Sequence, residues 1–229
     1  MRRKGRIVVL HLAIRYPFAG VVWQLLHHLI GFRALGLEVY YIEDHGAYAY
    51  DALAQTGTPD PSKNLKLVGD ILDRFGFAGR WAFFDTVKND YVGMPKDQCL
   101  KLIRESDAVF NLCGASEPRE QHFASPLMVY IETDPGVFQV GIERKDPMAV
   151  RNAQAHKLFF TYATNIGAPD CRFPTAGLKW HTTRPPVLLD QWHPGVGPAN
   201  PAAFTTVGTW RNKGNDIDIG GSTYYWSKH

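Results

Sequence analysis

The N-terminal stretch constrains the fold more than any other part of the chain. Arg6 to Ala13 is a short run of β-branched and aliphatic residues, typical of a strand buried on both faces. Beyond a loop, hydrophobic residues recur at helical spacing from Val22 to Leu35, and Gly36 follows where a helix would end. Leu37 to Ile42 is a second β-rich run. The order strand, loop, helix, strand predicts a βαβ unit within a parallel sheet.

The same alternation continues through the first two thirds of the chain. Helices are expected over 65–75, 95–105 and 148–156, and further strands over 81–84, 108–112, 127–131 and 158–162. Strands that alternate with helices in this way form open sheets with helices on both faces. The sequence therefore predicts one α/β domain with a doubly wound, Rossmann-like parallel sheet.

The composition changes toward the C-terminus, where prolines accumulate. Of the 15 prolines, 11 lie after position 100, and several gather between Gln191 and Pro201. Residues 1–190 are expected to form the Rossmann-like domain, 191–201 a proline-rich linker, and 202–229 the first strands of a truncated second domain. The aromatic run at Tyr224 to Trp226 supports this division, because such side chains normally belong to a packed core.

Composition and charge exclude several classes of protein. With 229 residues, 45% hydrophobic and 21% charged, the chain is ordinary globular material rather than disordered or fibrous. The net charge of +3 is too small to indicate a nucleic-acid partner. Three separated cysteines fit a reducing compartment. No run reaches the length of a transmembrane segment, and the basic start lacks a signal-peptide cleavage site, so a cytoplasmic location is expected.

Sharp catalytic motifs are absent, and two weak ones have ordinary explanations. The chain has no glycine-rich dinucleotide loop, phosphate loop, zinc-protease motif or nucleophile elbow, and no cofactor is expected. His27 and His28 point about 100° apart on a helix, so they cannot clamp one metal, and one is expected to be packed and the other exposed. Asp216 and Asp218 spell a possible cation motif. Their alternation with isoleucines is explained better by an exposed strand face, so no metal site is predicted.

Polar residues at the ends of the expected strands form the most informative pattern. In open parallel sheets ligands bind at the carboxyl ends of the strands, so these residues are expected to line a ligand site. For each residue taken alone, a turn or helix cap is the commoner explanation. The residues are Arg15, Tyr16, Glu43, Asp44, His45, Asn111, Cys113, Ser116, Glu117, Glu132, Thr133, Asp134, Thr164 and Asn165.

Five segments resemble bacterial glycosyltransferase-like proteins of the GT-B architecture. The first two are Tyr16 to Gln24 and Gly31 to Asp44. The others are Tyr130 to Gly136, Phe160 to Cys171 and Phe204 to Trp210. The resemblance covers nearly the whole chain. It implies two Rossmann-like domains facing a cleft, of which this chain would supply the N-terminal, acceptor-side domain and the start of the second.

That resemblance implies transfer of a sugar from a nucleotide-sugar donor to an acceptor hydroxyl. The donor would be held mainly by the C-terminal domain, so these residues alone are expected to lack transfer activity. Asp44, His45 and Asp134 are the candidates for the catalytic base. Arg15, Tyr16, Gly20, Glu43, Glu132 and Asn165 are the candidates for substrate binding. A non-catalytic α/β module that binds a ligand or partner is the alternative, followed by a nucleotide-dependent enzyme of another class.

Overall fold

The structure is a computed structural model that describes residues 5–192, 202, 216–219 and 221–225. The N-terminal βαβ unit is present as predicted, with β1 (Arg6–Leu10), α1 (Ala19–Ala34) and β2 (Glu38–Glu43). After the hairpin of β3 (Ala49–Asp51) and β4 (Thr56–Thr58) come α2 (Ser62–Arg74), β5 (Trp81–Asp85), β6 (Asp90–Gly93) and α3 (Lys96–Glu105).

The second half of the chain continues the alternation. It contains β7 (Ala108–Leu112), α4 (Glu120–Phe123), β8 (Met128–Glu132), α5 (Val137–Glu143), α6 (Pro147–Ala155), β9 (Leu158–Thr161) and β10 (Trp180–Thr182). A 3-10 turn, η1 (Leu189–Gln191), and the small hairpin of β11 (Ile217–Ile219) and β12 (Ser222–Tyr224) follow. None of the helices in the described part of the chain has the length and apolar character needed to cross a membrane.

The main sheet confirms the predicted doubly wound, Rossmann-like α/β fold. Its eight strands run in the order β10-β9-β8-β7-β1-β2-β5-β6. All neighbours are parallel except β5 and β6, which are antiparallel. Because β1 lies between β2 and β7, the chain first winds one way from β1 and later the other way. The carboxyl ends of β1 and β7 therefore flank the point where the winding reverses.

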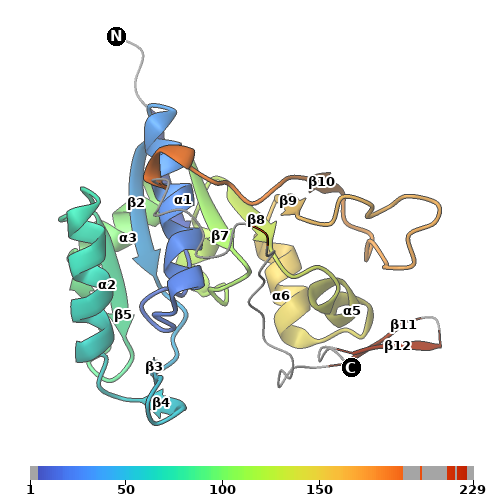
Figure 1. Cartoon of the computed structure of the whole chain (residues 1–229), viewed down its shortest axis with the longest axis horizontal. Coiled ribbons are helices and arrows are strands. Elements are labelled where there is room, and N and C mark those ends of the chain that lie inside the picture. The colour runs from blue at the N-terminus through green and yellow to red at the C-terminus, as the bar shows by residue number, and fades with distance from the viewer. Residues whose placement is uncertain (1–4, 193–201, 203–215, 220, 226–229) are drawn as a thin grey trace.

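Two layers of helices enclose this sheet (Figure 1). On the face toward the viewer, α1 and α2 pack on alternate residues of the central strands, among them Ile7, Val9 and Val39. On the opposite face, α3 covers Val8 and Leu10. Further along that face, α5 and α6 pack around the fully or nearly buried strand residues Tyr130 and Phe159. Strands covered on both faces explain the uninterrupted hydrophobic runs seen in the sequence.

The chain beyond β10 returns across the front of the sheet to α1, where Figure 1 shows η1 against that helix. This return segment, residues 183–192, is here named the strap. Both His27 and His28 are buried, partly beneath the strap, so the expectation that only one of them is buried was wrong. The Leu188 N–H donates to His27 Nδ1 over 3.2 Å, and the Trp192 ring lies 4.9 Å from that of Trp23. The strap covers a helix surface that would otherwise face water.

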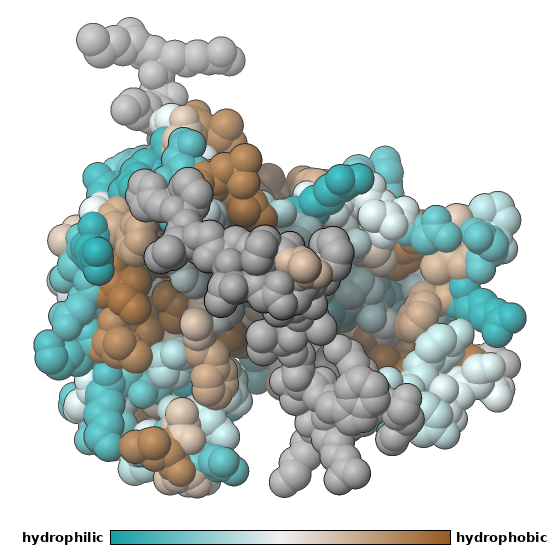
Figure 2. Space-filling model, in the orientation of Figure 1, coloured by the Kyte–Doolittle hydropathy of each residue, from teal (hydrophilic) through white to brown (hydrophobic). Residues whose placement is uncertain are grey.

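Three further expectations need adjustment or lie outside the described residues. β1 ends at Leu10 rather than Ala13, and the N–H groups of Ala13 and Ile14 bond to the side chains of Tyr41 and Glu43 instead of a neighbouring strand. Gly20 lies in the first turn of α1, not in the preceding loop. The expected strand at Phe204 to Gly208 and most of the linker at 191–201 lie outside the described residues. Figure 2 shows that hydrophobic residues on the front of the molecule gather over α1 and the adjoining side of α2.

Candidate functional site

The predicted polar residues do lie at the carboxyl edge of the sheet, but in two separate groups. Glu43, Asp44 and His45 end β2, whereas Glu132 ends β8 and Asp134 follows it. β1 and β7 lie between these two strands. With neighbouring strands about 4.8 Å apart, the groups are separated by roughly 14 Å along the edge. They share an edge without forming one constellation.

Glu43 is a fully buried carboxylate that shapes the loop after β1. Its oxygens accept the N–H groups of Ile14 and Arg15, each over 2.6 Å, and the hydroxyl of Tyr41. His45 Nε2 lies 2.9 Å from Oε1 of Glu43. These donors use the whole carboxylate, so Glu43 fixes the chain rather than facing a ligand.

His45 is held in one tautomer by two contacts. Its Nδ1 accepts the N–H of Ala47 over 3.0 Å, so the ring proton is on Nε2, which donates to Glu43. Both ring nitrogens are therefore engaged, and the imidazole side chain is only 3% exposed. This geometry leaves His45 without a free nitrogen to accept a proton from a substrate.

Asp44 lies on the other face of β2 and is also fully buried. Its carboxylate forms an ion pair with Arg119 and accepts the Tyr91 hydroxyl over 2.6 Å and the Gln121 amide over 3.0 Å. His122 Nε2 is 3.3 Å away, and burial together with Arg119 lowers the pKa of this histidine to about 4. Asp44 thus joins β2 to the β7–β8 connection, and the structure gives it partners on every side.

The N-terminal loop residues also have structural contacts. The Tyr16 ring lies 5.4 Å from the Tyr50 ring, tilted by 46° to it, and the Arg15 guanidinium lies 4.9 Å above Tyr16. Gly20 is exposed in α1, with nothing within 4 Å of where a side chain would begin. Of this group, Arg15 and Tyr16 form the surface of the β1–α1 loop beside the β3–β4 hairpin.

Glu132 differs from Glu43 because half of its carboxylate is unused. Both donors bind one oxygen: the Gln139 amide lies 2.8 Å and the Thr161 hydroxyl 2.6 Å from Oε2. Oε1 is buried and has no hydrogen-bond partner among the described residues. Burial raises the pKa of Glu132, and nearby Asp134 adds to the effect. A buried carboxyl group with an unsatisfied oxygen is costly to keep, so it marks a candidate site.

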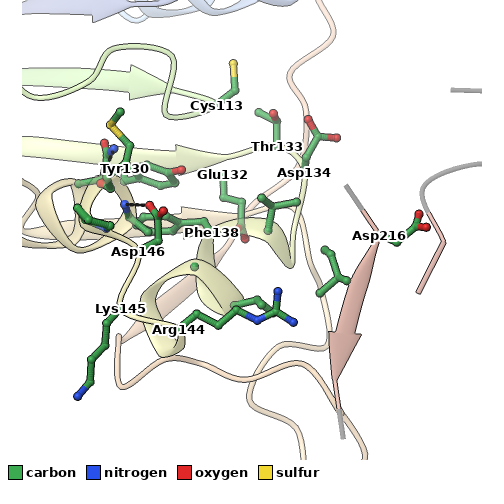
Figure 3. Close-up of a pocket in the computed structure, with 18 residues that line it drawn as sticks. Cys113, Tyr130, Glu132, Thr133, Asp134, Phe138, Arg144, Lys145, Asp146 and Asp216 are labelled. Atoms are coloured by element: carbon green, nitrogen blue, oxygen red, sulfur yellow. Dashed lines mark hydrogen bonds between the residues drawn. The ribbon is translucent and has the colours of Figure 1, made fainter. Parts of the chain in front are cut away.

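Glu132 lines a cavity of about 1080 Å³, which we name the β8–α5 cavity. Thr133 and the exposed Asp134 stand on its upper wall in Figure 3, with Arg144 and Lys145 below. The Glu132 side chain points toward α5, while Asp134 points outward at the cavity mouth. The remaining walls come from α5, from the start of α6 and from β11. Carboxylates on one wall and cations on the other can accept and donate hydrogen bonds to the same ligand.

Asn165, the remaining predicted binding residue, lies in a separate hollow of about 230 Å³ behind this cavity. Gln139 lines that hollow and connects it to Glu132. This glutamine is fully buried, donates to Glu132 and accepts the Gly136 N–H over 2.9 Å. Asn165 therefore lies near the Glu132 group but faces another space.

Sequence reasoning missed Gln139, Thr161 and Arg144. Gln139 lies in α5 and Arg144 directly follows it, and the sequence pattern did not predict this short helix. Thr161 is the last residue of β9. The pattern of polar strand ends, applied to the expected strand 158–162, selected Thr164 and Asn165 because Thr161 lies inside that range. Among the residues that the structure describes, no group of three His, Cys, Asp or Glu side chains is placed to hold a metal ion.

Comparison with known proteins adds one distant likeness. No protein-family profile and no curated protein sequence matches this chain. Among solved structures it is similar to an alpha-glucosyltransferase in complex with UDP and a 13-mer DNA containing a central A:G mismatch. The TM-score is 0.43 at 13% sequence identity, and the match covers 81% of this chain and 42% of that one. The chain thus spans less than half of that structure. The candidate site of this chain is therefore defined by its own residues and distances.

Proposed function

We propose that this chain is the acceptor-binding part of a sugar transferase, and that its acceptor occupies the β8–α5 cavity. The observation that carries the proposal is the pairing of Glu132 and Asp134. Two carboxyl groups, one buried with a free oxygen and one exposed, line the same cavity at the carboxyl end of a central strand. Hydroxyl groups need acceptors and a base of this kind to become nucleophiles.

Asp134 is the proposed base and Glu132 a binding residue. Of the three base candidates suggested by the sequence, Asp44 is fully buried in an ion pair with Arg119 and both ring nitrogens of His45 are hydrogen bonded, whereas Asp134 is exposed and lines the cavity. Glu132 has a raised pKa, so its free oxygen can carry a proton and donate a hydrogen bond to an oxygen of the sugar. When Glu132 is ionised, the same oxygen can accept a hydrogen bond from a sugar hydroxyl. Gln139 and Thr161 fix its orientation by holding Oε2.

The remaining walls suit a polyhydroxylated acceptor. Arg144 supplies N–H donors on the wall opposite Glu132 and Asp134. A space of about 1080 Å³ lies at the upper end of the range of small-molecule sites, so it accommodates a sugar or short glycan. Two of the segments that resemble glycosyltransferases, 130–136 and 160–171, line this cavity or the hollow behind it. The nucleotide-sugar donor is proposed to approach from the open side.

A binding experiment tests the acceptor half of the proposal. Isotope-labelled protein is titrated with a panel of monosaccharides and short oligosaccharides, and amide shifts are followed by NMR. We expect saturable shifts at Thr133, Asp134 and Val137 for at least one sugar. Glu132→Gln should weaken that binding about fivefold or more, since it replaces a carboxyl group that can either donate or accept with an amide that cannot ionise.

The matched control is Glu143→Gln, which makes the same chemical change at an exposed position of α5 outside the cavity lining. Its affinity for the sugar should equal that of the native chain. If no sugar in the panel shifts the cavity residues, the acceptor assignment is wrong. Saturable binding in a full-length protein that transfers no sugar from any nucleotide-sugar would favour the non-catalytic binding module instead.

A further inference from the structure

A second cavity lies under the strap, on the opposite face of the sheet from α5. Here β7, β8 and β9 present Phe110, Ile131 and Phe160, which pack toward α1. Side chains one position away on the same strands, such as Tyr130 and Phe159, pack on the α5–α6 side instead. The strap and one end of α1 border these residues, and the space between them is about 290 Å³.

The strap is anchored at both ends, so its position beside the cavity is fixed. At one end the Thr183 N–H donates to the Thr161 carbonyl over 2.9 Å. At the other end Leu188 bonds to His27 over 3.2 Å. Pro185 and Pro186 lie between the anchors, and two consecutive prolines keep that backbone extended. Pro186 and the half-buried Phe32 of α1 add apolar surface to the lining of this cavity, and the exposed Arg184 of the strap borders it as well.

Two polar atoms in this lining have no hydrogen-bond partner within the part of the chain that the structure describes. His28 is 6% exposed, and its Nδ1 donates to the Gln24 carbonyl over 2.7 Å, which leaves Nε2 as an unprotonated acceptor. No partner for Nε2 occurs among the described residues. The Tyr162 hydroxyl is likewise buried without a hydrogen bond. Burial lowers the pKa of His28 and raises that of Tyr162 to about 12, so the first stays neutral and the second stays protonated.

We propose that the strap cavity binds a small flat molecule with an aromatic ring and a hydroxyl or amino group, which pairs with His28 Nε2 and the Tyr162 hydroxyl. The ring fits between Phe110, Phe160 and Pro186, where aromatic faces and apolar surface surround it. The size is adequate, because an engineered cavity of about 150 Å³ already holds benzene. The polar group would satisfy the Tyr162 hydroxyl, a buried atom that has no hydrogen bond among the described residues, and would donate to His28 Nε2. This site is independent of the sugar-binding proposal.

Phenol and toluene are suitable probes because they share a shape and differ only in the hydroxyl group. Both are titrated into the isotope-labelled chain, and affinities are taken from amide shifts at Phe110, Phe160 and Thr183. We expect saturable binding of phenol. The phenol-to-toluene affinity ratio should fall about fivefold to tenfold in Tyr162→Phe and in His28→Phe, as expected for loss of one hydrogen bond.

Using the ratio removes the general difference in hydrophobicity between the probes. Tyr162→Phe deletes only a hydroxyl group without a partner, so it is expected to fold even if His28→Phe does not. Tyr48→Phe, at a 52% exposed tyrosine outside this cavity, is the control and should leave the ratio unchanged. Absence of phenol binding overturns the proposal. So does a ratio that Tyr162→Phe leaves unchanged or that Tyr48→Phe also lowers.

Discussion

His45 donates from Nε2 to Oε1 of Glu43 over 2.9 Å, and this contact joins the last residue of β2 to the turn that follows it. The same carboxylate accepts two backbone N–H groups from the loop after β1. One buried side chain thus fixes the connections after two neighbouring strands. The carboxyl edge of the sheet owes its shape at β1 and β2 to this residue, while the edge at β8 remains open for a ligand.

Glu43→Gln should therefore destabilise the fold. The amide that replaces one oxygen is a donor and would face N–H groups that also donate, leaving buried groups unpaired. We expect a loss of about 3 kcal/mol in the free energy of unfolding, measured by urea denaturation. Glu143→Gln, at an exposed position of α5, should change it by about 0.5 kcal/mol or less. Equal stability of the two variants would contradict the role given to Glu43.

Stability should fall on mild acidification because three buried histidines resist protonation. Burial lowers the pKa values of His11, His122 and His156 to about 4 each, below the value of 6.5 for an unfolded histidine. Between pH 6.5 and 4 the unfolded chain binds more protons, so the free energy of unfolding decreases as the pH falls. Each histidine contributes up to about 1.4 kcal/mol per pH unit within that window.

Unfolding curves recorded from pH 7 to pH 4 would measure this slope, and NMR titration of the imidazole signals would assign it. His156→Gln removes one titrating group, so it should reduce the slope of the free energy of unfolding against pH by ~1.4 kcal/mol per pH unit. An imidazole signal of His156 that titrates near pH 6.5 would show that this ring is not buried in its neutral form.

The fold could be predicted well from sequence because each central strand is covered on both faces. Such strands appear as short unbroken hydrophobic runs, and their alternation with helices allows few topologies. Strand ends were less accurate. β1 stops at Leu10 because the N–H groups beyond it bond to Tyr41 and Glu43, and contacts between distant residues leave no local pattern.

The candidate site could be predicted only as an edge of the sheet. Sequence shows that Asp44 and Asp134 follow strands, but not that β1 and β7 separate them. Nor does it show which carboxylates have partners: Asp44 meets Arg119 and Tyr91, which lie far along the chain. The burial of both His27 and His28 was missed for the same reason, because the strap that covers them lies far along the chain. Leu188 of the strap, which contacts His27, is 161 positions away from it.

Two glycines should respond in opposite ways to alanine. Gly136 precedes α5 with a φ of +117°, and a Cβ there would lie 2.7 Å from the Phe173 ring. Gly136→Ala should cost about 1–3 kcal/mol, because the backbone conformation and the contact are both unfavourable. Gly20 lies in the first turn of α1 with open space around it, so Gly20→Ala should stabilise by about 0.5 kcal/mol. Thermal unfolding of both variants gives the comparison, and a stable Gly136→Ala would show that this turn can relax.

Asp134→Asn tests the proposed chemistry most directly. Asp134 is exposed, so the substitution should leave the free energy of unfolding unchanged within about 0.5 kcal/mol. If its carboxylate takes the proton of the acceptor hydroxyl, kcat for sugar transfer in the full-length protein should fall about 100-fold or more, with little change in acceptor affinity. Asp170→Asn makes the same change at an exposed position outside the β8–α5 cavity lining and should leave kcat intact. Unchanged turnover in Asp134→Asn would remove it as the base, and Glu132 would then be the carboxylate to test at the same cavity.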